Sequence, residues 1–188
     1  MTVNRLLVLF IFVPLVALAQ TRGAPDFQIT KITKNLISAP QFTYAGAGQY
    51  QTNQRQRWLE VEVEFAATPE FTEELTVKYY ILFNGRVLTG EVTHANVLSG
   101  RERRSVIYVS PNALAHLSEN RPITTNTTQN VAVQIVQQGT VKDEATLARA
   151  QPQWYANLPQ LSGFLLNKDQ TPFAPLYWDR YEQIKASH

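Results

Sequence analysis

Hydrophobic and polar residues alternate along several stretches of the chain, as they do in β-strands that bury one face. The clearest stretch is Arg57–Ala67, in which every second residue from Leu59 to Phe65 is apolar. Trp58 and three glutamates occupy the alternate positions. The pattern predicts that the apolar side chains face a core and that the three carboxylates face water. A cation site formed by these carboxylates is the alternative interpretation.

The same reasoning predicts further strands elsewhere in the chain, which are Phe27–Ile37, Glu73–Phe83, Arg86–Val97, Arg103–Ser110, Asn130–Gln138 and Leu161–Asn167. Asn84-Gly85 lies between two of them and predicts a two-residue hairpin, because both central residues of a type I′ turn need a positive φ. Thr68-Pro69-Glu70 and Ser99-Gly100-Arg101 are predicted as turns, and Ala39–Gln56 as a long loop. Lys142–Ala150 is predicted to form either a short helix or an irregular stretch at the edge of a strand.

Two helices are predicted. Ser110-Pro111 has the residue types of a helix cap and a first helical position, so Asn112–Leu117 should form a short connecting helix. Near the end of the chain, aromatic and aliphatic residues recur at helical spacing, which predicts an amphipathic helix over Leu176–Ala186.

These elements predict a mainly β protein, because no β-α-β rhythm and no internal repeat is visible. An immunoglobulin-like antiparallel β-sandwich with the connecting helix and the C-terminal helix is the first choice, although the Cys–Trp–Cys pattern of that fold is missing. A small barrel is the second choice. Residues 20–188 are expected to form this single domain.

The first nineteen residues have the order of a secretory signal peptide. Arg5 precedes the apolar run Leu6–Ala19, which closes on the small-x-small triplet Ala17-Leu18-Ala19. A retained anchor is the alternative, but about 20 apolar residues are needed to span a bilayer, and Pro14 interrupts the run. We therefore expect an exported protein, periplasmic or associated with the outer surface, without a stable membrane anchor after cleavage.

Composition excludes several classes of site. The chain has no Cys, which excludes disulfide scaffolds, thiol nucleophiles and lipidation at Cys. The formal net charge is +2, and it falls to +1 when Arg5 leaves with the signal peptide. A balance so close to neutral offers no electrostatic argument for binding nucleic acid or a charged membrane surface.

Motifs that would indicate catalysis are missing from the sequence. The three histidines lie far apart, with no H-x-x-H or H-E-x-x-H spacing, and there is neither a G-x-S-x-G elbow nor a phosphate-binding glycine loop. We therefore predict a protein that is not an enzyme and has no cofactor, no metal and no catalytic residues. A Ser–His–Asp set assembled only in three dimensions, using His94 or His116, is a minor alternative.

The remaining candidate chemistry is that of an interaction surface. The run from Arg101 to Arg104 is the densest positive charge, and aromatic residues crowd the C-terminal third. The predicted interaction surface comprises Trp58, Arg101, Arg103, Arg104, Trp154, Tyr177, Trp178 and Tyr181. The alternatives are that the arginines form a solvated turn, and that the C-terminal third covers an edge or a face of the sandwich.

Four segments carry a resemblance to a known family, namely the signal ending Ala17-Leu18-Ala19, the strand and hairpin Val77–Arg86, the run Ser105–Pro111 and the closing Pro175–Tyr181. In these the chain resembles the small exported immunoglobulin-like proteins encoded in secretin-containing pilus-assembly gene clusters of Verrucomicrobia. The resemblance implies a sandwich fold and a role in envelope or pilus-like assembly. It implies no catalytic set, so no functional residue is carried across.

Together these observations predict a structural or interaction protein, an accessory of a pilus-like or envelope assembly, whose partners are envelope or pilus-assembly proteins. The missing pilin processing site argues against a conventional pilus subunit. A carbohydrate-binding β-sandwich module that uses Trp58 or the Trp154 and Trp178 region to bind a glycan is the alternative.

Overall fold

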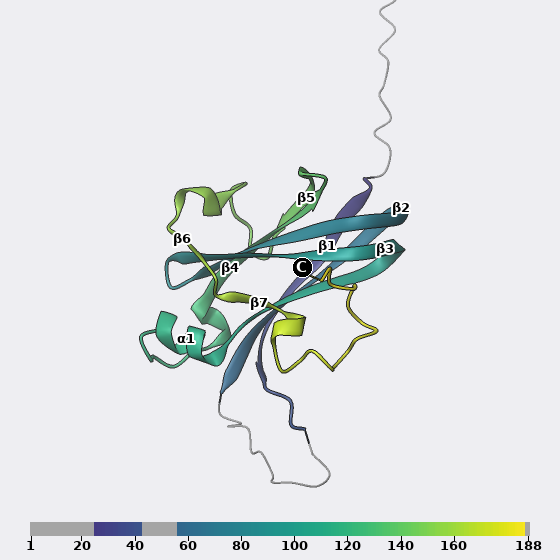
Figure 1. Ribbon diagram of the computed structural model, residues 1–188. Helices are drawn as coiled ribbons and strands as arrows, with labels where there is room; N and C mark the ends of the chain where they lie inside the picture. The colour runs from purple at the N-terminus through teal and green to yellow at the C-terminus, as the bar shows by residue number, and fades with distance from the viewer. Residues whose placement is uncertain (1–24, 43–55, 187–188) are drawn as a thin grey trace, which may run out of the picture.

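The computed structural model describes residues 25–42 and 56–186 and shows one strongly bent sheet with a short helix (Figure 1). The elements are β1 (Phe27–Ser38), β2 (Arg57–Phe83), β3 (Arg86–Val109), α1 (Pro111–Leu117), β4 (Thr128–Gln137), β5 (Thr140–Thr146), β6 (Gln160–Ser162) and β7 (Leu165–Asn167), with three short 3₁₀ turns at Thr125–Thr127, Trp154–Asn157 and Lys168–Gln170. No helix among these residues is long and apolar enough to cross a membrane. Most of the predicted loop Ala39–Gln56 lies outside the described residues.

A single long hairpin of β2 and β3 forms the centre of the sheet. Its turn is the predicted Asn84-Gly85, where φ is 48° and 75° and Phe83 pairs with Arg86. These positive angles suit Asn and Gly, which tolerate the left-handed region. The predicted two-residue hairpin is therefore confirmed.

The turns predicted at Thr68-Pro69-Glu70 and Ser99-Gly100-Arg101 are wrong. Strand β2 continues through the first of these stretches and β3 continues through the second. The pairing register of β2 and β3 shifts between Phe65 and Phe71, which marks bulges instead of a reversal of the chain. Proline is tolerated at a bulge because its missing N–H is not needed in the ladder there. The irregular stretch is held by neighbouring groups, since the Thr68 N–H donates to the Asp26 carbonyl at 2.8 Å and the Arg103 guanidinium donates to the Ser99 carbonyl at 2.6 Å.

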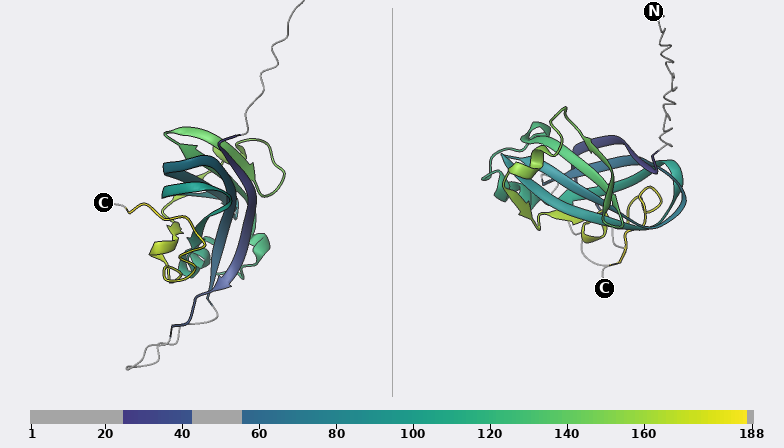
Figure 2. Two further views of the ribbon diagram at one scale, coloured as in Figure 1. Left: turned by 90° about the vertical axis from the view of Figure 1, so that its right-hand side faces the viewer. Right: turned by 90° about the horizontal axis from the view of Figure 1, so that it is seen from above.

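The bend lets one sheet supply two layers. The edge of β2 that faces away from β3 pairs with β1 along its first half and with β4 along its second half. Figure 2 shows the resulting curvature of the sheet. The predicted mainly β fold is confirmed, and the sheet is consistent with a β-sandwich, although its strands belong to one hydrogen-bonded sheet. The β3–β6 pair is parallel, so the sheet is mixed.

The core follows the alternation seen in the sequence. Leu59, Val61 and Val63 from the first half of β2 share one buried cluster with alternate residues of the second half, which are Val77, Tyr79, Ile81 and Phe83. The connecting helix α1 adds Leu114 to this cluster. Its start is as predicted, with the Ser110 hydroxyl accepting from the Ala113 N–H at 3.3 Å.

The C-terminal third is less regular than predicted. No helix forms over Leu176–Ala186, where the chain makes a turn at residues 178–180 and Ile184 then bridges to His94 on β3. The Ala95 N–H donates to the Gln183 carbonyl at 2.9 Å, so the free edge of β3 supplies the backbone partners that a helix would have supplied internally. The predicted strand Leu161–Asn167 is split into β6 and β7, and Lys142–Ala150 is mainly strand β5.

Candidate interaction surface

Residues 171–186, here called the C-terminal segment, cover part of the sheet face opposite the main core. Phe173 is 4% exposed and stacks on Tyr108 of β3 with ring centroids 4.7 Å apart. It also meets Trp58 of β2 edge-on, at 5.7 Å. Trp58 is therefore half-buried beneath the segment and does not present its ring freely to a partner.

Glu62 is the main polar anchor of the C-terminal segment. The Arg180 guanidinium donates to both oxygens of its carboxylate at 2.9 Å, and the Tyr181 hydroxyl donates at 2.7 Å. The hydrogen bond to Glu62 raises the pKa of Arg180, and burial raises the pKa of Tyr181. The Glu62 side chain is only 14% exposed, because the C-terminal segment lies over it.

The neighbouring glutamates are also engaged by the protein. The Arg104 guanidinium donates to Glu64 at 2.9 Å, and the Tyr108 hydroxyl donates to Glu60 at 3.3 Å. The prediction that this face is simply solvated is therefore wrong, since its glutamates are hydrogen-bonded or ion-paired and lie partly under the C-terminal segment. Among the described residues, no group of three or more His, Cys, Asp or Glu is arranged to hold a metal ion.

The arginine run is divided between internal and external roles. Arg104 pairs with the glutamates of β2, and Arg103 pairs with Glu182 of the C-terminal segment at 3.4 Å. Arg101 is exposed. Arg103 and Arg104 thus hold the C-terminal segment and the glutamates of β2 in place, and of the three predicted arginines Arg101 is the one left exposed.

Tyr177 and Trp178 are the aromatic residues that the C-terminal segment displays. Tyr177 is 58% exposed and Trp178 is 81% exposed. Tyr177 has a φ of 53°, an unusual angle for a bulky side chain, which costs backbone energy and persists only where the surroundings impose it. The Arg180 N–H donates to the Tyr177 carbonyl at 3.1 Å and closes the turn.

Both ends of this aromatic turn are fixed to the sheet. Phe173 precedes it and is buried against Tyr108, and Arg180 follows it and is bonded to Glu62. Because the anchors lie within four residues on either side, they restrict the turn without help from the exposed rings.

Trp154 belongs to a different part of the surface. It packs edge-on against Tyr155, with ring centroids 5.6 Å apart, and Tyr155 stacks on Tyr80 of β2 at 3.8 Å. The Tyr155 hydroxyl donates to the Glu144 carboxylate at 3.2 Å, which ties this segment to β5. Trp154 is half-buried and serves this local cluster, so it does not join Trp178 in one site.

A serine–histidine pair that sequence spacing could not reveal lies in the core. His94 Nε2 is 2.7 Å from the Ser105 hydroxyl, and that oxygen also accepts from the Tyr79 hydroxyl at 2.6 Å. On its other side, His94 Nδ1 lies 3.1 Å from the Glu182 carbonyl. Burial lowers the pKa of His94 to about 4, which keeps the ring neutral.

This pair lacks the access that a nucleophile requires. Ser105 is 0% exposed and His94 is 1% exposed, and the group on the far side of the imidazole is a backbone carbonyl in place of a carboxylate. His116, the other candidate, is exposed on α1 and stacks on Phe164. The His94 network therefore acts as an internal tie between β3 and the C-terminal segment.

The predicted site residues thus fall into separate environments. Tyr177 and Trp178 form an exposed pair, whereas Trp58, Arg103, Arg104 and Tyr181 support the segment that carries it. The sequence does contain one hint of this support, namely acidic residues on β2 and basic residues at the end of the chain that could pair. Glu62 and Arg180 form such a pair although they are 118 positions apart.

Comparison with known proteins gives one family and one fold. A family model matches residues 18–188. The crystal structure of a protein from Akkermansia muciniphila is similar, with a TM-score of 0.74 over 88% of this chain and 95% of that chain. The sequence identity is 18%, so this likeness shows the fold. No curated protein matches the chain.

Proposed function

The chain belongs to the family whose model matches residues 18–188, and we propose that it is an exported, non-enzymatic interaction protein. In this proposal it is an accessory of a pilus-like or envelope assembly and binds envelope proteins through its aromatic turn. The structural likeness to a verrucomicrobial protein agrees with the expected resemblance at the level of fold. The pilus context itself is part of the proposal.

Export is supported by the start of the chain. The charged and apolar order of Met1–Ala19 is that expected of a secretory signal peptide. The family match begins at residue 18, next to the expected cleavage point after Ala19, so nearly all of the apolar run lies outside the matched part.

The observation that carries the interaction role is the rigid display of Trp178. A tryptophan that is 81% exposed would lose contact with water on binding, and Trp and Tyr dominate the binding energy of many protein interfaces. The turn is anchored before a partner arrives, so little conformational entropy is lost on binding.

Pull-down from envelope extracts tests this proposal. The double variant Tyr177→Ala/Trp178→Ala should lose about tenfold or more of the captured secretin or other envelope protein, as expected for removal of interface hot spots. Phe71→Ala is the matched control, because Phe71 is also exposed, at 53%, and lies on β2 outside the aromatic turn. Equal capture by the double variant and the control would exclude the aromatic turn as the binding surface.

Carbohydrate binding is the second candidate, and the same pair of exposed rings favours it. Asp179 follows Trp178 and is exposed, so an aromatic face and a hydrogen-bond acceptor lie together. A glycan array separates the two candidates, since it should show binding that is lost with Trp178→Ala only if a sugar is the ligand. An array without binding would leave the protein partner as the proposed ligand.

A further inference from the structure

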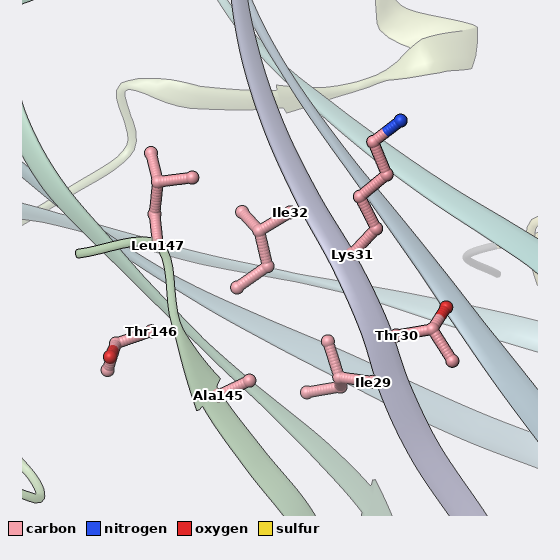
Figure 3. Close-up of a pocket in the computed structure, with 7 residues that line it drawn as sticks. All are labelled: Ile29, Thr30, Lys31, Ile32, Ala145, Thr146 and Leu147. Carbon is pink, nitrogen blue, oxygen red and sulfur yellow. The ribbon is translucent and has the colours of Figure 1, made fainter. Parts of the chain in front are cut away.

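The edges of the bent sheet are protected in two different ways. β1 and β5 face each other across a groove lined by Ile29–Ile32 and Ala145–Leu147, and both isoleucines point toward the β5 side (Figure 3). The Ile29 N–H donates to the Asp143 carboxylate of β5 at 2.6 Å, so this backbone donor is already paired. Edge strands need such protection against pairing with other chains, and here the two edges protect each other.

The outer edge of β3 is protected by the end of the chain. Residues 180–186, here called the terminal arm, pair with it in the antiparallel sense. The Ala95 N–H donates to the Gln183 carbonyl at 2.9 Å, and the Lys185 N–H donates to the Thr93 carbonyl at 2.8 Å. The terminal arm thus occupies the position that a partner's strand takes in β-augmentation.

The polar partners of the terminal arm lie on the central hairpin. Apart from the bond within the aromatic turn, its partners among the described residues are Glu62, Glu74, Thr93, His94, Ala95, Arg103 and Arg104. All of them precede the aromatic turn in the chain. A second copy presents the same partners in the same arrangement, so its hairpin can bind the terminal arm of the first copy through identical contacts.

The turn that joins the terminal arm to the rest of the chain is strained. Tyr177 has a φ of 53°, in the left-handed region that bulky side chains avoid. An extended hinge relieves this angle and carries the terminal arm away from its own sheet. Short hinges under strain favour the exchange of the element that follows them between two copies.

We propose that two copies of this chain exchange their terminal arms, so that the arm of each copy pairs with β3 of the other. Residues 177–179 open as the hinge, and the pair is closed because each copy gives one arm and receives one. Exchange adds to the proposed function a partner of another kind, a second copy of the chain, bound at another surface.

Charges along the terminal arm select this occupant. The arm is basic at residue 180, acidic at residue 182 and basic at residue 185, and these side chains pair with Glu62, Arg103 and Glu74 of the hairpin. An unrelated strand would have to reproduce this order of charges to compete, because mismatched charges oppose binding. Another copy of the chain has the same order by identity.

Engineered cysteines test the exchange, because the chain has no Cys of its own. Ala95→Cys and Gln183→Cys are made as two separate variants of the mature chain. Residues 95 and 183 pair across the edge, and Cα atoms in such a hydrogen-bonded pair lie about 5.5 Å apart, within reach of a disulfide. Neither variant can form this disulfide within one chain, so a link between residues 95 and 183 reports exchange alone.

The two cysteine variants are mixed in denaturant, refolded together at low and at high protein concentration, and then oxidised. A dimer band on a non-reducing gel should appear after refolding at high concentration, and peptide mass spectrometry should identify the 95–183 disulfide in it. Refolding at low concentration should give closed monomers without this link, because the two forms have the same contacts and concentration decides between them.

Hinge variants test the role of strain. Tyr177→Gly should raise the dissociation constant of the pair by about tenfold or more, because glycine adopts a positive φ without strain and the closed monomer is stabilised. Trp178→Gly is the matched control, since it adds the same flexibility at the neighbouring residue, where φ is not positive. Analytical ultracentrifugation measures both dissociation constants, and circular dichroism checks that both variants are folded.

Several outcomes would overturn the proposal. They are a chain that stays monomeric after refolding at high concentration, a pair without the 95–183 disulfide, and equal dissociation constants for Tyr177→Gly and Trp178→Gly. Sedimentation of species larger than two copies would contradict the closed pair. The pull-down with envelope extracts depends on the exposed rings of the monomer, so it can succeed where exchange fails.

Discussion

Replacing Phe173 with alanine is expected to lower the free energy of unfolding by about 3–5 kcal/mol, the usual cost of deleting a buried phenyl ring. The ring is 4% exposed and lies between Tyr108 and Trp58, so its removal leaves a cavity beneath the C-terminal segment. Denaturant unfolding followed by tryptophan fluorescence measures this change, and Trp58 reports on the affected contact itself.

The matched control is Phe71→Ala, which deletes the same ring at a position that is 53% exposed. Its cost should stay below about 1 kcal/mol, because little buried surface is lost. Limited proteolysis should cleave the Phe173 variant within residues 171–186 first. If the two variants were equally stable, Phe173 would not anchor the C-terminal segment.

Acidification from pH 6.5 to pH 4 is expected to lower the free energy of unfolding by about 3 kcal/mol through His94, at about 1.4 kcal/mol per pKa unit. Burial lowers the pKa of His94 from its ordinary 6.5 to about 4 in the folded protein. Between these values the unfolded chain binds a proton that the folded protein does not. The contribution is therefore fully present above pH 6.5 and is lost as the pH falls toward 4.

The variant His94→Gln isolates this contribution, because the side chain can still form hydrogen bonds but does not titrate. It should be less stable at pH 7 and should show a shallower loss of stability between pH 6.5 and 4. Glu182 has the opposite effect on the pH dependence of stability, because burial raises the pKa of its carboxyl. Both proteins keep Glu182, so its effect cancels when the slopes of variant and parent are compared. His116→Gln, at an exposed position, should retain the parent slope. A His94→Gln slope equal to that of the parent would contradict the assignment.

Local patterns predicted the elements that depend on neighbouring residues. The alternation from Leu59 to Phe65 identified the buried face of β2, because the period of two residues in a strand sets which side chains share a face. Asn84-Gly85 and Ser110-Pro111 identified a turn and a helix start for equally local reasons, namely backbone angles and a capping hydroxyl.

Patterns failed where a distant segment decided the outcome. The residues of Leu176–Ala186 have helical spacing, but the backbone of that stretch pairs with β3 across residues 93–95, and its side chains pack on β2. Thr68-Pro69-Glu70 has the composition of a turn. Residues before and after it pair with β3, however, so β2 continues through this stretch with bulges. Tertiary pairing outweighs local propensity in both cases.

The candidate interaction surface was predicted only in part. Aromatic and basic residue types identified Tyr177 and Trp178, but also Trp58 and Trp154, which are half-buried in separate clusters. Residue type cannot separate an exposed ring from a buried one, because both roles use the same side chains.

By itself, the sequence determined a mainly β domain, the hairpin at Asn84-Gly85 and the capped helix after Ser110, since each depends on contacts within a few residues. Only the tertiary structure decided which carboxylates meet which arginines, that His94 is buried against Ser105, and that β1 and β5 face each other across a groove. These features join residues many tens of positions apart. Their energies come from burial and pairing that exist only once the bent sheet has formed.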